Sequence, residues 1–117
     1  MIEQIINLLL EKTEYNYYFG AAPEPQTCVA YEYHDTSNDG IKHSGRLKLN
    51  IMAEGLSEKT LLVLEEMAKN INSVILTVAD NPLTNSIRKV SQNGGGIMAN
   101  EGTKTTHKIL YYDILGR

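Results

Sequence analysis

The sequence lacks the features that mark exported, membrane-spanning and nucleic-acid-binding proteins. It has a single cysteine, Cys28, which rules out an intramolecular disulfide and suits a reducing compartment. No apolar run approaches the ~20 residues that a membrane-spanning helix needs. The run IINLLL follows Glu3 rather than a basic segment, so we expect no signal peptide and a cytoplasmic location. A net charge of −3 argues against a broad basic face for nucleic acid.

The aromatic composition is also unusual, because the chain has no tryptophan, one phenylalanine and seven tyrosines. Tyrosine has an apolar ring and a polar tip, and it is enriched at protein interfaces. Half-buried strand positions explain tyrosines equally well. A length of 117 residues with 42% apolar residues is enough for one domain with its own core, so we treat residues 1–117 as a single domain.

The clearest local pattern is a strand followed by a helix. In Arg46–Glu54 apolar and polar residues alternate, which predicts a strand with one buried and one wet face, and Met52 is the apolar exception on the wet face. Gly55 ends the strand, and Ser57 is placed to cap the next helix. That helix carries an apolar stripe made of seven residues: Leu61, Leu62, Val63, Leu64, Met67, Ala68 and Ile71.

The remaining elements follow from periodicity and turn signals. We predict an amphipathic helix over residues 2–13, and strands over Thr27–His34, Leu83–Gln92 and Thr103–Leu115. Glu14–Gln26 reads as a connector because of its two prolines, and Asp35–Ser44 as a loop with the hairpin signal Asp39-Gly40. Ser73–Ala79 either prolongs the second helix or forms an extended segment, and its β-branched residues favour the second option.

This order of elements predicts an α+β fold. A mostly antiparallel four-stranded sheet is packed by the N-terminal helix and the central helix. The last strand has apolar residues on both sides, with Ile109 and Tyr111 pointing one way and Leu110 and Tyr112 the other. We therefore expect cover on both of its faces, either from a neighbouring subunit or from the two helices of the chain itself.

Two loops resemble known binding motifs, but each departs from its motif at a required position. Asp35-Thr36-Ser37-Asn38-Asp39-Gly40 has the first oxygens and the glycine of a calcium loop, but position 12 is Arg46 instead of glutamate. Gly94-Gly95-Gly96 with Gly102-Thr103-Lys104-Thr105 approaches a phosphate-binding loop, but Thr103 separates the glycine from the lysine, and a strand follows. We interpret the first as a hairpin turn and the second as a mobile hairpin tip, Asn93–Gly102.

Metal binding and nucleophilic catalysis are poorly supported as well. His34 and His43 are expected near each other across the hairpin, which with His107 makes at most a weak metal site, because structural zinc needs four Cys or His ligands. Cys28 lies within a strand and fits a small buried or interfacial thiol better than a nucleophile. We therefore expect no enzyme activity, no cofactor and no metal.

With this order of elements, the chain resembles the small tail-terminator and minor-capsid proteins of tailed bacteriophages and prophages, which sit at the end of the tail tube or in the neck. The resemblance covers most of the chain. It rests on the N-terminal helix, the strand pair around VAYEY and RLKLNIMAEG, the helix SEKTLLVLEEMAKNI and the closing strand THKILYYDILGR.

The resemblance implies a homo-oligomeric ring, commonly a hexamer, that caps the tail tube and joins it to the head. Tail-tube and head-connector proteins would be its partners, DNA would pass through the lumen without specific binding, and no membrane would be involved. The expected location is the virion tail or neck, after assembly in the bacterial cytoplasm. Our candidate interface residues are Tyr17, Tyr18, Met52, Gly94, Gly95, Gly96, Tyr111 and Tyr112.

Two alternatives remain open at this point. One is another head–tail connector protein, such as a stopper. The other is a small non-catalytic domain for ligand binding or protein interaction, which would need convergent polar groups in a pocket.

Overall fold

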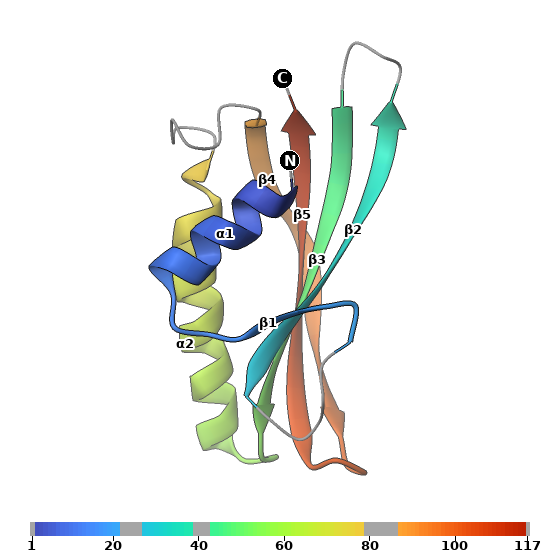
Figure 1. Ribbon diagram of the computed structural model, residues 1–117. Helices are drawn as coiled ribbons and strands as arrows, with labels where there is room; N and C mark the ends of the chain where they lie inside the picture. Colours follow the sequence, from blue (N-terminus) through green and yellow to red (C-terminus); the bar gives the residue numbers. More distant parts are fainter. Residues whose placement is uncertain (1, 22–26, 39–42, 79–86, 117) are drawn as a thin grey trace.

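The alternation in Arg46–Glu54 determines which side of the sheet carries the core. In the computed structural model, which describes residues 2–21, 27–38, 43–78 and 87–116, this segment lies in the middle of the sheet. The elements in chain order are α1 (Ile2–Lys12), β1 (Tyr17–Phe19), β2 (Cys28–Asn38), β3 (His43–Glu54), α2 (Glu58–Ile75), β4 (Ile87–Asn100) and β5 (Thr105–Gly116) (Figure 1).

The strands form one mixed sheet in the order β1-β2-β3-β5-β4. The pair β1–β2 is parallel, and the other three pairs are antiparallel. The predicted α+β class is confirmed, but the sheet has five strands and not four. The additional strand, β1, lies in the stretch interpreted as a connector. Its three residues are too few for a recognisable alternation, and only the pairing with β2 makes them a strand.

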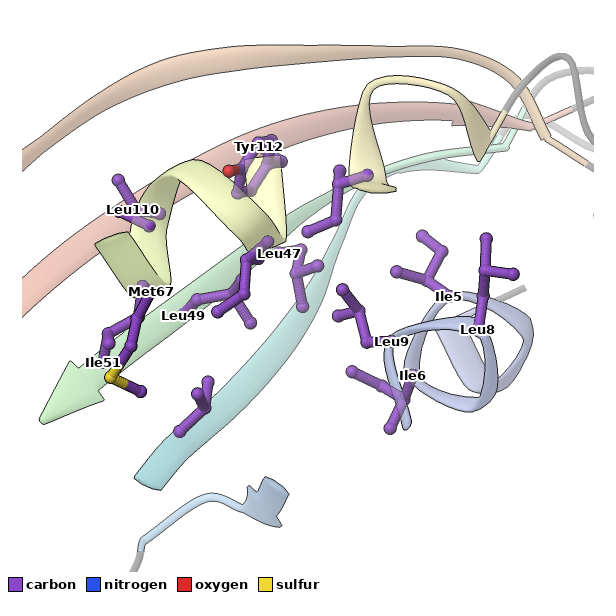
Figure 2. Packing of buried hydrophobic residues seen from close by; sticks show 14 of the residues in the cluster. Ile5, Ile6, Leu8, Leu9, Leu47, Leu49, Ile51, Met67, Leu110 and Tyr112 are labelled. Atoms are coloured by element: carbon purple, nitrogen blue, oxygen red, sulfur yellow. The ribbon is translucent and has the colours of Figure 1, made fainter. Parts of the chain in front are cut away.

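Both helices pack on the same face of the sheet. Leu47, Leu49 and Ile51 of β3 are fully buried there, together with residues of α1 and α2 (Figure 2). Each such side chain stabilises the fold by about 1.5–3 kcal/mol relative to an exposed position. Because successive strand residues point to opposite sides, the other face of β3 and β5 is left without a helix in the described part of the chain. The alternative in which the two helices cover both faces was wrong.

Helix α2 ends later than its composition suggested. It continues to Ile75, and Thr77 Oγ1 donates a hydrogen bond to the Val74 carbonyl at 2.8 Å just beyond its end. Ile71 and Ile75 are one turn apart and both fully buried, so packing overrides the β-branched preference of this stretch. The extended segment favoured for Ser73–Ala79 was wrong for its described residues. Ala79 itself lies outside the described residues.

The start of α2 also differs from expectation. Ser57 is the N-cap residue, but its side chain makes no capping hydrogen bond. Its carbonyl accepts the backbone N–H of Leu61 at 3.3 Å. Thr60 Oγ1 donates to the Glu54 carbonyl at 3.2 Å and so ties the first turn back to β3.

The apolar stripe of α2 is narrower than predicted. Leu61, Leu62 and Val63 are 38%, 69% and 44% exposed. Three consecutive helical residues spread over about 200° at ~100° each, so they cannot share one buried face. The residues that do face the core are Thr60, Leu64, Met67, Ala68, Ile71 and Ile75.

Strands β2 and β3 extend beyond the residues in which apolar and polar side chains alternate. β2 runs to Asn38 and β3 starts at His43, so most of the predicted loop 35–44 is paired strand, while Asp39-Gly40 lies outside the described residues. In this pairing His34 lies opposite Arg46, and His43 lies opposite Asn38. The expected histidine pair across the hairpin was therefore wrong.

Two tyrosines with different hydroxyl surroundings give a paired test of the core. The Tyr112 hydroxyl donates to Asn72 Oδ1 at 2.9 Å, whereas the Tyr33 hydroxyl is buried without a partner among the described residues. Tyr112→Phe should lower the free energy of unfolding by about 1 kcal/mol, because it leaves Asn72 unpaired. Tyr33→Phe should leave it unchanged or raise it by a few tenths (about 0.3 kcal/mol). Urea unfolding followed by circular dichroism measures both, and equal losses would contradict the assignment.

Candidate interaction surfaces

The face of the sheet opposite the helices, which we call the open face, is the first candidate surface. Ile109 and Tyr111 of β5 lie on it, each only partly buried. The expectation that this strand has a second apolar side to cover is therefore met, and within the described residues no helix provides the cover.

A small apolar cluster lies at the β1 end of the open face. Cys28, Ala30 and Met52 are buried, and Tyr18 of β1 packs against them. Met52 is only 2% exposed, so the prediction that its side chain is exposed was wrong. Its role in an interface stays a prediction. Its neighbours on β2 and the ring of Tyr18 cover it, which alternation within one strand cannot show. Cys28 is fully buried, as its strand position suggested.

His107 lies beside this cluster with both ring nitrogens in hydrogen bonds. Its Nδ1 is 3.0 Å from Asn50 Oδ1, and its Nε2 is 2.9 Å from Thr105 Oγ1. In register it stands between Met52 of β3 and Met98 of β4. The imidazole is 6% exposed and serves as a satisfied polar member of the sheet. Among the described residues no group of three His, Cys, Asp or Glu side chains is placed to hold a metal ion.

Further along the open face, Asp113 joins three strands. Its Oδ1 accepts from Arg46 Nε at 3.2 Å, and its Oδ2 accepts from Asn93 Nδ2 at 2.7 Å. The Arg46 guanidinium also stands 5.9 Å from the centre of the Tyr111 ring. These contacts connect β3, β5 and β4 and position Tyr111 on the open face, where the sequence placed it as a candidate interface residue.

Tyr17 and Tyr112 lie on the helix-covered side. Tyr112 is fully buried in the core, so its assignment to an interface was wrong. Burial raises the pKa of its phenol to about 12. Tyr17 is half-buried against the same core, its hydroxyl is 2.7 Å from Thr13 Oγ1, and burial likewise raises its pKa to about 12. The interface role of Tyr17 stays a prediction.

The three glycines are part of a strand. β4 runs through Gly94, Gly95 and Gly96 to Asn100, and the turn to β5 follows at residues 101–104. The mobile tip predicted for Asn93–Gly102 was therefore wrong, because pairing with β5 outweighs the weak strand preference of glycine.

Two of these glycines have conformational reasons to be there. Gly94 and Gly95 have φ values of +88° and +153°, and the register with β5 shifts between Gln92 and Gly95. A Cβ atom at Gly95 would also collide with the Ile109 carbonyl oxygen. Gly96 has neither constraint, since a Cβ atom there would meet open space.

The free edge of β4 is a feature that the sequence did not reveal. β4 is the last strand of the sheet, and Ile97 and Met98 near its end are 54% and 56% exposed. At the opposite edge, the Phe19 side chain of β1 is 75% exposed and meets the Tyr31 ring edge-on with the ring centres 5.6 Å apart. Adjacent exposed apolar residues beside unpaired backbone are typical of strands that pair with another chain.

Three shallow hollows in the described structure are lined by ordinary surface residues. One of them, of about 420 Å³, lies between the end of α1 and α2 beside the Tyr15–Asn70 hydrogen bond. It contains no arrangement of a nucleophile, a base and an oxyanion donor. In the described ranges no helix is long and apolar enough to cross a membrane.

Comparison with known proteins gives a fold likeness. No protein-family model matches the chain, and no curated protein matches it either. Among solved structures, a chain of the "virion of native gene transfer agent (GTA) particle" is similar to 98% of this chain and to 90% of its own length. The TM-score is 0.63 and the sequence identity 12%. At this identity the likeness shows that the two chains share a fold.

Met52 and Met98 make a matched pair for testing the apolar cluster, since they flank His107 on the same face. Met52→Asp should lower the free energy of unfolding by about 3 kcal/mol, because it buries a carboxylate among apolar groups. Met98→Asp should change it by less than about 1 kcal/mol. Thermal unfolding compares the two, and an unfolding free energy unaffected by Met52→Asp would mean that this side chain is accessible.

The neighbouring glycines provide a second test. Gly95→Ala should destabilise the protein by about 2 kcal/mol, because its conformation is strained for alanine and its Cβ atom meets the β5 backbone. Gly96→Ala should be neutral or slightly stabilising. Urea unfolding of the two single variants gives the difference, and equal effects would contradict the bulged course of β4.

Proposed function

We propose that this protein is a non-enzymatic structural component of a phage-type particle, of the tail-terminator type. The observation that carries the proposal is the fold likeness to a virion chain of a gene transfer agent, which extends over 98% of the present chain. The elements that match the tail-terminator pattern in sequence, namely the N-terminal helix, the central strand and the cross-sheet helix, are present as α1, β3 and α2.

The surfaces of the molecule support an assembly role. The open face has half-buried aromatic and apolar side chains, and the β4 edge has exposed Ile97 and Met98. The described hollows provide no catalytic arrangement. Surfaces of this kind favour protein partners over a small-molecule substrate.

The mechanism of such a protein is geometric. Copies joined head to tail form a closed ring when the rotation between neighbours closes, and a closed ring presents no further repeat for growth. A ring seated on the last layer of a tail tube would end its polymerisation and offer its other side to the head. The proposed assembly is a hexamer with tail-tube and head-connector proteins as partners, located in the tail or neck of the virion.

Deletion of the gene in a producing strain tests the proposal. We expect overlong tail tubes and unjoined heads in electron micrographs of the lysate, with joined particles restored by the wild-type gene supplied in trans. Complementation with Met52→Asp should be impaired, because the added carboxylate destabilises the fold, whereas Leu62→Asp, at an exposed position of α2, controls for the added charge.

The pattern of defects separates the related functions. Tails of normal length that fail to join heads would indicate a stopper-type connector and overturn the terminator assignment. Normal particles from the deletion strain would overturn a structural role in the particle altogether.

A further inference from the structure

The two edges of the sheet are complementary to each other. At one edge, β1 covers only Val29–Tyr31 of β2, and no described strand pairs with the outer side of Glu32–Asn38. At the other edge, no described strand pairs with the outer side of β4. Through the antiparallel pairs in between, β4 runs opposite to both β1 and β2. A second copy in the same orientation would therefore bring β4 antiparallel to β1.

The register across the sheet shows which residues of β1 and β4 lie at the same level along the strand direction, which we call the same height. The successive partners of Phe19 are Tyr31, Leu49, Leu110 and finally Gly95. The corresponding series of paired residues across the sheet leads from Tyr18 to Gly96 and from Tyr17 to Ile97. A neighbouring copy at the same height thus has its aromatic strand β1 beside the glycines of β4.

Bulky and missing side chains complement each other at this height. Phe19, which is 75% exposed, would lie opposite Gly95, and Tyr18 would lie opposite Gly96, where a Cβ atom would meet open space. An aromatic ring on one strand covers a glycine on the antiparallel neighbour without a clash and shields its backbone. The contact would cover the exposed Phe19 ring and would give both glycines an aromatic neighbour.

We propose that the outer edge of β4 in one copy pairs antiparallel with β1 of a second copy, with Phe19 over Gly95 and Tyr18 over Gly96. The contact is heterologous, because it joins two different edges, and repetition of it generates a ring or an open array. The inference deepens the proposed function by identifying the surface through which copies of the chain associate.

Self-association of the purified full chain, measured by sedimentation over a range of concentrations, tests the contact. Phe19→Ala should weaken association about tenfold or more, because it removes an exposed aromatic anchor. Leu62→Ala is the matched control, since Leu62 is 69% exposed on α2 and belongs to neither edge strand, and it should leave association unchanged. Circular dichroism verifies that each variant is folded.

A substitution on β4 tests the same pairing from the other edge. Ile97→Asp should weaken association about tenfold, because it places a charge on the exposed apolar part of that edge, and Leu62→Asp on α2 is its matched control. Equal losses from Phe19→Ala and Leu62→Ala, or from Ile97→Asp and Leu62→Asp, would overturn the proposal. A chain that stays monomeric at the highest concentration would also overturn it, and the deletion phenotype in cells judges the proposed function separately.

Discussion

The packing of both helices on one face of the sheet is the constraint on which the rest of the structure depends. Leu47, Leu49 and Ile51 of β3 form the floor of the core, and α1 and α2 bury them from the same side. Because strand side chains alternate, this choice assigns every second residue of β3 and β5 to a face without helical cover. In a sheet with helices on one side only, the apolar side chains of the second face have to be covered, and its polar groups paired, without a second layer of helices.

The protein covers and pairs these groups through local side-chain contacts. Tyr18 from the short strand β1 covers Met52 and Ala30, and His107 is satisfied through both of its ring nitrogens. Asp113 connects Arg46 to Asn93 across three strands. These side chains are polar or amphipathic, so the open face is ordered in the monomer. It still has aromatic and apolar groups for a partner. The same face can therefore serve stability and assembly.

The two edges have a different character from the faces. β1 protects only a short part of β2, and β4 ends the sheet with a glycine-containing segment and two exposed apolar residues. Natural sheets usually protect such edges with charge, proline or bulges. Here the register shift in β4 and the pair Arg88 and Lys89 protect its first part, and the segment after Gly95 has no charged residue. The uncharged segment lies at the height of the aromatic strand at the opposite edge, which is the basis for considering the two edges as partners.

The sequence by itself determined the α+β class, the central strand, both helices and the buried faces of β3 and β5, because hydrophobic periodicity is a local property that folding preserves. It also indicated that Tyr111 lies on the side of its strand opposite Leu110 and Tyr112. Only the tertiary structure decided the short strand β1, the burial of Met52 and Tyr112, the helical state of Ser73–Ile75 and the strand course of the glycines. In each of these cases the outcome depends on contacts between segments distant along the chain, which pairing and packing create and which local propensity does not contain.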